Sequence, residues 1–238
     1  MSKKIVVLGS HGRMGSLAIE TIQKDKRFIL AGGLDKEDNI EEVLDKTDVD
    51  IVVDFTLPSS VFQNAKKVLS RKKHHIIGAT GLTKDQTDWL SNYCKEKMLG
   101  CAIIPNFSIA CALMIRASRM VAAYMSDVEI IEYHHSNKKD APSGTAKHTA
   151  QLIQAQHNVS FPDLCREKSI PIHSIRNDGF VANQEVIFGQ AGESLILQHT
   201  TNDRSAFMPG LLWVCEHIGT YQSLVVGLEN MLPWDKQF

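Results

Sequence analysis

The stretch that decides the fold is Gly9-Ser10-His11-Gly12-Arg13-Met14-Gly15. It follows the apolar run Ile5 to Leu8, and apolar residues recur at helical spacing from Met14 onward. Glycines between a strand and a helix let backbone N–H groups approach a pyrophosphate, whose charge the helix dipole favours. The spacing of the three glycines is a weak signal alone, but its position between strand and helix predicts a dinucleotide-binding turn.

A carboxylate and two cations are predicted to meet the adenosine ribose of this nucleotide. Asp35 lies 20 residues beyond Gly15, at the end of the next strand, where a carboxylate binds the ribose 2′-hydroxyl of NAD. Lys36 and Arg13 suit the 2′-phosphate of NADP, although a solvated surface charge explains each nearly as well. NADH and NADPH therefore both remain open. From the turn and its rim we expect cofactor contacts at Gly9, Gly12, Arg13, Met14, Gly15, Asp35 and Lys36.

Strand and helix patterns alternate through the first hundred residues. We predict strands at 5–8, 28–34, 51–55, 75–78 and 101–104. Because short loops join these strands to the helical patterns between them, we expect a Rossmann-like, doubly wound parallel sheet of the α/β class. Phe55, Gly78 and Thr80 follow the third and fourth strands, at the carboxyl ends where such sheets bind ligands. Cofactor contact is expected at these three residues, although simple turn closure explains each loop equally well.

The alternation stops after Pro105, which indicates a second domain. Helical patterns at 109–125 and 146–156 flank a strand at 128–133. Three extended runs then follow without helices between them, at 170–175, 185–188 and 194–200. This order predicts an α+β domain with a mixed β-sheet.

The apolar tail is predicted to be helical from Met208 to Ile218 and on through Val226, and to pack back on the first domain. We therefore divide the chain into a dinucleotide-binding domain, formed by 1–105 and 209–238, and a second domain, 106–208, for substrate binding and oligomerisation.

Composition excludes several classes of protein. The chain has 238 residues, with 26 Lys and Arg against 27 Asp and Glu, so it lacks the cationic excess typical of nucleic-acid binding. No apolar stretch approaches the roughly 18 residues of a membrane span, and the N-terminus does not resemble a signal peptide. Its five cysteines include no C-x-x-C pair, and their odd number favours a reducing compartment. We expect a cytoplasmic protein that binds neither nucleic acid nor membranes.

The chemically richest stretch runs from His134 to Thr145. Adjacent histidines on an extended segment point in opposite directions, so His134 and His135 are expected to differ in role. An imidazole facing a cleft can carry a proton near neutral pH, and Lys138 adds a positive charge for a carboxylate or developing anion. Ser143 then opens a helix, whose N-terminal N–H groups bind anions. A plain capping loop with surface lysines is the competing interpretation, and no metal is expected because zinc-site spacing is missing.

Three segments together resemble the dihydrodipicolinate reductase family of the lysine and diaminopimelate pathway, also called 4-hydroxy-tetrahydrodipicolinate reductases. They are Gly12-Arg13-Met14-Gly15, Pro105-Asn106-Phe107-Ser108, and His134-His135 with Lys138 and Asp140-Ala141-Pro142-Ser143-Gly144-Thr145. The resemblance covers essentially the whole chain, and the last segment is its most distinctive part. Departures from the family pattern occur at Ile109-Ala110-Cys111 and between Arg176 and Glu185.

The resemblance implies a fold, an activity and a set of site residues. It implies a homotetramer assembled through the mixed sheet, and NADH- or NADPH-dependent reduction of 4-hydroxy-tetrahydrodipicolinate, through dihydrodipicolinate, to tetrahydrodipicolinate, a small dicarboxylate. His134 and Lys138 would act at the reacting ring as the catalytic residues. Substrate binding is implied for His135, Ser143, Gly144, Thr145 and Arg204, and cofactor contact is implied for Asn106 and Phe107.

Two alternatives to this activity stay open at the level of sequence. One is an NAD(P)-dependent dehydrogenase that acts on another small imine or keto acid. The other is a sensor that binds a dinucleotide without turnover. A sensor is expected to lose His134 and Lys138 while keeping the glycine turn, and this chain keeps both features.

Overall fold

The computed structural model describes residues 2–161 and 169–234. It forms two compact units, the first from Met1–Ser108 with Phe207–Phe238 and the second from Ile109–Ala206. Four cysteines are described, and all four are buried. The fifth, Cys165, lies outside the described residues.

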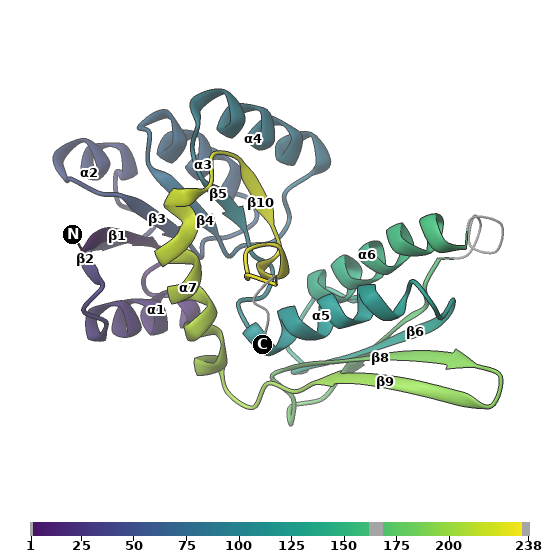
Figure 1. Ribbon diagram of the computed structural model, residues 1–238. Helices are drawn as coiled ribbons and strands as arrows, with labels where there is room; N and C mark the ends of the chain where they lie inside the picture. Colours follow the sequence, from purple (N-terminus) through teal and green to yellow (C-terminus); the bar gives the residue numbers. More distant parts are fainter. Residues whose placement is uncertain (1, 162–168, 235–238) are drawn as a thin grey trace. The chain divides into compact units, whose positions relative to one another are not determined.

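The first unit is a six-stranded parallel sheet in the order β10-β5-β4-β3-β1-β2, with helices on both faces (Figure 1). The strands are β1 Lys3–Leu8, β2 Phe28–Leu34, β3 Ile51–Asp54, β4 His74–Ile77, β5 Cys101–Ile103 and β10 Leu224–Val226. The helices are α1 Arg13–Lys24, α2 Ile40–Lys46, α3 Val61–Ser70, α4 Lys84–Lys97 and α7 Met208–His217. Central strands of such a sheet are buried on both sides, and Ile5 to Leu8 are at most 1% exposed. The predicted doubly wound sheet is confirmed.

The prediction for the end of the tail is wrong. Leu224–Val226 is not helical but forms β10, which pairs in parallel with Cys101–Ile103 and extends the sheet beyond the predicted strands. A run of three apolar residues carries no period that separates a strand from a helix. The free edge of β5 decides the outcome, because it offers unpaired backbone groups that the returning chain satisfies.

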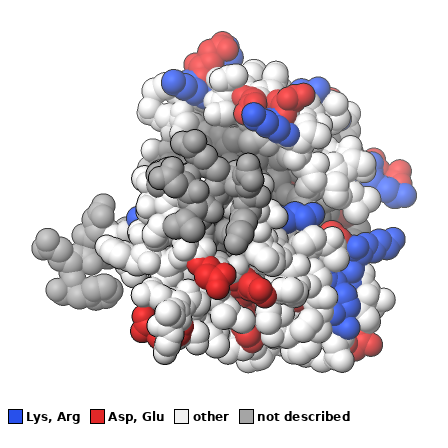
Figure 2. Space-filling view, turned by 90° about the vertical axis from the view of Figure 1, so that its right-hand side faces the viewer, with Lys and Arg blue, Asp and Glu red and all other residues white. Residues whose placement is uncertain are grey.

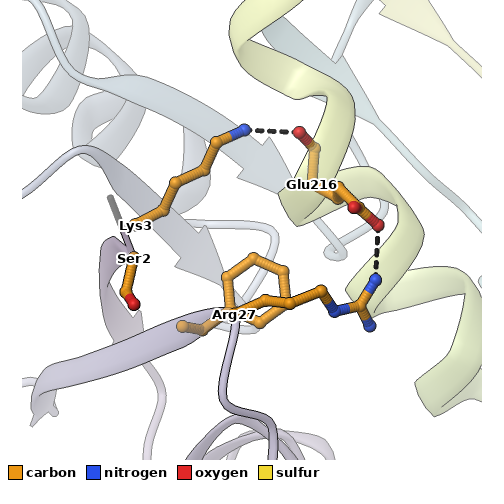
Figure 3. A pocket seen from close by; sticks show the side chains of 5 residues that line it. Ser2, Lys3, Arg27 and Glu216 are labelled. Atoms are coloured by element: carbon orange, nitrogen blue, oxygen red, sulfur yellow. Dashed lines mark hydrogen bonds and ion pairs between the residues drawn. The ribbon is translucent and has the colours of Figure 1, made fainter.

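Two cations attach helix α7 to the first strands of the sheet (Figure 3). Lys3 Nζ donates to the backbone oxygens of Cys215 and Glu216, which belong to the last turn of α7. A positive charge at the C-terminus of a helix is stabilising, because the helix dipole places partial negative charge there. Arg27, just before β2, forms an ion pair with the Glu216 side chain. Lys3, Arg27 and Glu216 line a pocket on the first unit and fix the returning segment to β1 and β2.

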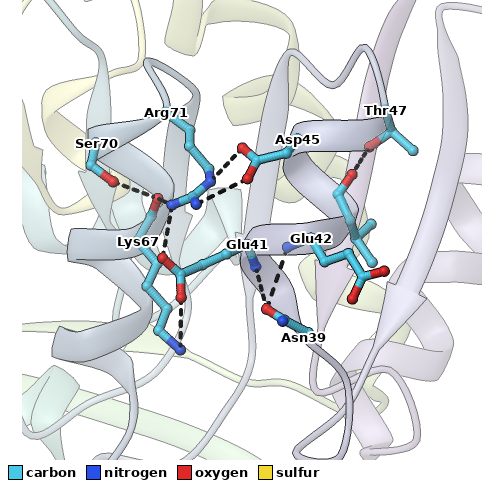
Figure 4. A network of polar contacts seen from close by, with 9 residues as sticks. Asn39, Glu41, Glu42, Asp45, Thr47, Lys67, Ser70 and Arg71 are labelled. Atoms are coloured by element: carbon cyan, nitrogen blue, oxygen red, sulfur yellow. Dashed lines mark hydrogen bonds and ion pairs between the residues drawn. The ribbon is translucent and has the colours of Figure 1, made fainter.

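Helices α2 and α3 are joined on the surface by a polar network (Figure 4). Arg71 donates from Nε to Asp45 Oδ1 at 2.7 Å and from Nη1 to Glu41 Oε1 at 3.0 Å. Asn39 begins α2 as its N-cap, and its side chain accepts from the backbone N–H groups of Glu41 and Glu42. Exposed pairs of this kind contribute little each, so the network mainly orients the two helices.

The second unit contains a four-stranded mixed sheet in the order β7-β6-β8-β9. Its strands are β6 Asp127–His134, β7 Ile172–Arg176, β8 Ala182–Gln190 and β9 Glu193–His199, and its helices are α5 Ile109–Val121 and α6 Gly144–Ser160. Strand β6 pairs in parallel with β7 and antiparallel with β8. The two helices cover one face of this sheet, over a core that includes Ile130, Ile153 and Phe188 (Figure 1). The predicted mixed sheet is therefore confirmed.

The surface carries charges of both signs. Figure 2 shows Lys and Arg side chains intermingled with Asp and Glu side chains on one face, as the net charge of −1 leads one to expect. Within residues 2–161 and 169–234, no helix combines the length and the apolar character needed to cross a membrane.

Candidate active site

The glycine turn before α1 has a geometry that larger residues cannot adopt. Gly9 has φ +76°, in the left-handed region that disfavours side chains. A Cβ atom added at Gly15 would lie 2.0 Å from the Gly9 oxygen. The first turn of α1 therefore packs directly on the backbone that leaves β1, which is the close approach expected of a dinucleotide-binding turn.

The N-terminus of α1 is open to an anion. Gly12 is the N-cap and supplies no side-chain hydrogen bond to the first turn, which begins with Arg13 and Met14. The first N–H groups of a helix have no partners inside the helix, and they attract negative charge. A close-packed glycine cradle at an uncapped helix N-terminus fits the pyrophosphate of a dinucleotide.

Asp35 follows β2, and its carboxylate lies against the glycine turn. Oδ2 accepts hydrogen bonds from the Ser10 hydroxyl and from the backbone N–H of His11, and it lies 2.7 Å from His11 Nδ1. The adjacent Lys36 extends into solvent and pairs with Glu37 at 3.2 Å. The structure thus brings Asp35 to the turn, as the sequence predicts, and adds an imidazole that the sequence argument overlooked.

The other predicted cofactor residues of the first unit follow strands β3, β4 and β5. The ring of Phe55 packs so closely on Gly78 that an added Cβ would lie 2.4 Å from it. Phe55 meets Phe107 edge to face, with 5.8 Å between the ring centroids. Asn106 Oδ1 accepts a hydrogen bond from the Ser108 N–H, while Thr80 is exposed in the loop after β4. Phe55, Gly78 and Phe107 therefore form one cluster at the carboxyl ends of the strands.

A buried polar group supports this edge of the sheet. Asp54 ends β3 with no exposed surface and accepts hydrogen bonds from Thr56 and Asn64, while His75 Nε2 lies 3.6 Å away. Burial raises the pKa of Asp54, but the His75 and Thr56 contacts outweigh burial and lower it overall. The carboxylate fixes the backbone at Thr56, next to Phe55.

In the second unit, a buried carboxylate holds the ring of His134. Glu132 has no exposed side-chain surface, and its Oε2 contacts His134 Nδ1 at the end of β6. Arg176, on β7, donates to both oxygens of Glu132, at 3.0 and 2.8 Å. Burial raises the pKa of Glu132, but hydrogen bonds from His134 and Arg176 outweigh burial and lower it to about 2. An ionised carboxylate only accepts hydrogen bonds, so Nδ1 carries a hydrogen and Nε2 is left to act on a ligand.

The loop after β6 is fixed at several points. Arg176 also donates to the Asp140 backbone oxygen at 2.7 Å. Lys138 Nζ lies 2.7 Å from Asp140 Oδ1. Burial raises the pKa of Asp140, but the hydrogen bond from Lys138 outweighs it, and the pKa is lowered overall. The Ser136 hydroxyl donates to Asp178, beyond β7. The loop therefore presents the Lys138 side chain from a backbone anchored to the sheet.

The loop ends where α6 begins. Ser143 is the N-cap of α6, and its hydroxyl accepts from the Ala146 N–H at 3.2 Å. The Ser143 N–H in turn donates to Glu132 Oε1 at 3.2 Å. Gly144 and Thr145 form the first turn, where backbone N–H groups are available to an anion. One buried carboxylate thus connects the histidine, the loop and the start of the helix.

Comparison with protein families accounts for nearly the whole chain. The family model "Dihydrodipicolinate reductase, N-terminus" matches residues 3–107, and "Dihydrodipicolinate reductase, C-terminus" matches residues 108–232. The chain belongs to the dihydrodipicolinate reductase family. The resemblance predicted from the sequence is confirmed.

Curated relatives and solved structures agree with this membership. The 4-hydroxy-tetrahydrodipicolinate reductase of Coxiella burnetii is 40% identical over 239 residues, covering 98% of this chain and 100% of the relative. That of Legionella pneumophila is 37% identical over 243 residues, with the same coverage. Dipicolinate-bound dihydrodipicolinate reductase from Paenisporosarcina sp. TG-14 is 32% identical, with a TM-score of 0.83, and covers 98% of this chain and 100% of that one.

Two residues predicted to bind substrate are less constrained by the contacts above. His135 is half-buried and follows His134 at the start of the loop. Arg204 begins the short 3-10 helix Arg204–Phe207, near the end of the second unit. The roles of both residues remain predictions, as do those of the other predicted site residues. Among the described residues, no group of three or more His, Cys, Asp or Glu side chains is arranged to hold a metal ion.

Neither Glu132 nor Arg176 is among the site residues predicted from the sequence. A signal for Glu132 was present, because Val128, Ile130 and Glu132 alternate along one strand and so share its buried face. A buried carboxylate requires a partner. That partner is 44 residues away in sequence, on a strand that pairs with β6, so local spacing does not reveal it.

Proposed function

We propose that this chain reduces 4-hydroxy-tetrahydrodipicolinate, through dihydrodipicolinate, to tetrahydrodipicolinate with NADH or NADPH, in diaminopimelate and lysine biosynthesis. It is an NAD(P)H-dependent oxidoreductase of the dihydrodipicolinate reductase family. The observation that carries the proposal is the Glu132 side chain, which holds His134 and the start of α6 together.

The first unit is proposed to bind the cofactor. Gly9, Gly12 and Gly15 would leave space for the pyrophosphate at the N-terminus of α1, and Asp35 would bind the adenosine ribose. The cluster of Phe55, Gly78 and Phe107 is proposed to hold the nicotinamide end. When bound, the nicotinamide supplies a hydride to the substrate ring.

The second unit is proposed to bind the ring and supply the proton. Ser143, Gly144 and Thr145 hold one carboxylate at the N-terminus of α6, because its N–H groups and dipole favour an anion. Lys138, which is paired with Asp140, stabilises negative charge that develops on the ring. His134 donates a proton from Nε2, and ionised Glu132 stabilises the imidazolium form that carries it. The Paenisporosarcina structure is described as dipicolinate-bound, which supports a ring dicarboxylate as ligand.

Assembly and location complete the proposal. Strand β8 pairs with β9 through Ile187 and Ile196, and Ile196 is 54% exposed on the sheet. Exposed apolar residues on a broad sheet face suit a second copy of the chain. We infer a homotetramer assembled through this sheet, located in the cytoplasm. Sedimentation velocity tests the assembly, because a monomer at micromolar concentration would contradict it.

A coupled assay tests the activity directly. Dihydrodipicolinate synthase generates the unstable ring substrate in the cuvette, and oxidation of NADH or NADPH is followed at 340 nm. We expect oxidation that depends on the synthase with at least one of the two cofactors. No oxidation with either cofactor would contradict the proposal. Nucleotide binding without oxidation would instead favour a sensor, and oxidation with other imines or keto acids alone would favour a different dehydrogenase.

A further inference from the structure

An imidazole contacts the carboxylate that is proposed to face the adenosine ribose. His11 Nδ1 lies 2.7 Å from Asp35 Oδ2, and the His11 side chain is 91% exposed while that of Asp35 is 26% exposed. The same oxygen accepts from the backbone N–H of His11 and from the hydroxyl of Ser10. The turn that is proposed to bind the pyrophosphate therefore also places an imidazole beside the proposed ribose site.

The charges around this pair are few. Asp35 and Lys36 follow β2, Glu37 and Asp38 lie in the next turn, and Arg13 begins α1. Asp38 accepts from the Asp35 backbone N–H at 2.7 Å, and Lys36 pairs with Glu37. Imidazole is the side chain that ordinarily changes charge between pH 5 and 8. His11 carries the imidazole that lies against Asp35.

We propose that His11 makes the choice between NADH and NADPH depend on pH through its ion pair with Asp35. The inference rests on the proposed cofactor site. With His11 neutral, the Asp35 carboxylate accepts a hydrogen bond from the 2′-hydroxyl of NADH, and its full negative charge repels the 2′-phosphate of NADPH. With His11 protonated, the pair is neutral, so the repulsion falls. The cationic ring also competes with the hydroxyl for the carboxylate.

Both effects act in the same direction. As pH falls, binding of NADPH strengthens relative to NADH, so the ratio of Kd for NADH to Kd for NADPH rises. The 2′-phosphate also loses charge as pH falls, because its second ionisation lies near pH 6, and this changes both its repulsion by Asp35 and its attraction to nearby cations. This ionisation belongs to the ligand and is present with every variant. The contribution of His11 is therefore the difference between the wild type and a variant that lacks the imidazole.

The experiment measures Kd of NADH and NADPH by nicotinamide fluorescence at pH 8.5 and 6.0, at low constant ionic strength and without substrate. The proteins are the wild type and His11→Asn, which keeps a polar side chain but does not titrate. We expect the Kd ratio to rise about fivefold more in the wild type than in His11→Asn, the size of one exposed ion pair. His173→Asn removes another exposed imidazole, which pairs with Glu129 at 2.9 Å in the second unit. It is expected to behave as the wild type.

Each other result contradicts a definite part of the argument. Equal changes in the wild type and His11→Asn would overturn the role of His11 while leaving the cofactor site in place. The role would also be overturned if the rise in the Kd ratio were reduced as much in His173→Asn as in His11→Asn, because the effect would not be specific to Asp35. Failure of the wild type to bind either nucleotide would contradict the proposed function itself. As a second readout, the His11 imidazole resonance in NMR is expected to shift when NADP⁺ binds, and no shift would overturn the proposal.

Discussion

The two candidate sites are built in opposite ways. The glycine turn of the first unit works by the absence of side chains, so that backbone atoms approach a ligand closely. The loop of the second unit works by charged side chains held around one buried carboxylate, Glu132. The first site therefore depends on local sterics, whereas the second depends on pairing between distant strands. The two sites should therefore fail in different ways when mutated.

The largest expected effect is on stability, from removal of Arg176. Arg176→Leu leaves Glu132 buried without the guanidinium that donates to both of its oxygens, and breaking a buried pair costs about 3 kcal/mol. Urea denaturation of the wild type and the variant measures the loss. The double variant Glu132→Gln with Arg176→Leu removes both charges and is expected to recover part of it. A single variant as stable as the wild type would contradict the account of this pair.

The acid stability of the protein should also report on Glu132. Its pKa is lowered from an ordinary value of 4.5 to about 2. A carboxyl of this kind contributes stability that is fully present above about pH 4.5 and is lost as pH falls toward 2. After allowance for solvent screening, we expect this contribution to be about 2 kcal/mol.

Unfolding free energies of the wild type and Glu132→Gln between pH 5.5 and 2.5 test the prediction. The wild type should lose more stability over this range than the variant. Parallel curves would show that Glu132 is not the group responsible.

A substitution in the glycine turn is expected to weaken nucleotide binding only. In Gly15→Ala the new Cβ would lie 2.0 Å from the Gly9 oxygen, so the turn must shift away from the geometry that receives a pyrophosphate. We expect Kd for both NADH and NADPH to rise at least tenfold. Gly32→Ala, in β2, is the matched control, because its Cβ would meet nothing within 4 Å. Equal affinities in Gly15→Ala and Gly32→Ala would contradict the account.

The smallest effect is expected at the surface of the first unit. Arg71 pairs with two carboxylates, Asp45 and Glu41 (Figure 4), which are 58% and 44% exposed, whereas the carboxylate partner of Arg176 has no exposed side-chain surface. Arg71→Ala should change the melting temperature by less than about 2 °C, because exposed pairs contribute little. Differential scanning calorimetry measures the change. A loss as large as that of Arg176→Leu would show that burial of the carboxylate partner does not set the difference between the two ion pairs.

The same contrast explains how much the sequence reveals. Gly9 to Gly15, the alternating strands and the Ser143 helix start are encoded by neighbouring residues, and the structure forms the corresponding elements. The strand Leu224–Val226 and the contacts of Glu132 with Arg176 are tertiary, because partners distant in sequence decide them. The contact of His11 with Asp35 belongs to the same class. Periodicity describes which face of an element is buried, but not which element lies against it.

The central claim is that the Glu132-held His134 supplies the proton while the glycine turn binds the cofactor. The most direct test is the steady-state kinetics of His134→Gln in the synthase-coupled assay, together with Kd for NADH and NADPH. We predict that kcat falls at least hundredfold while both nucleotide affinities remain within twofold of the wild type. A kcat close to that of the wild type would contradict the claim, as would an equal loss of nucleotide binding.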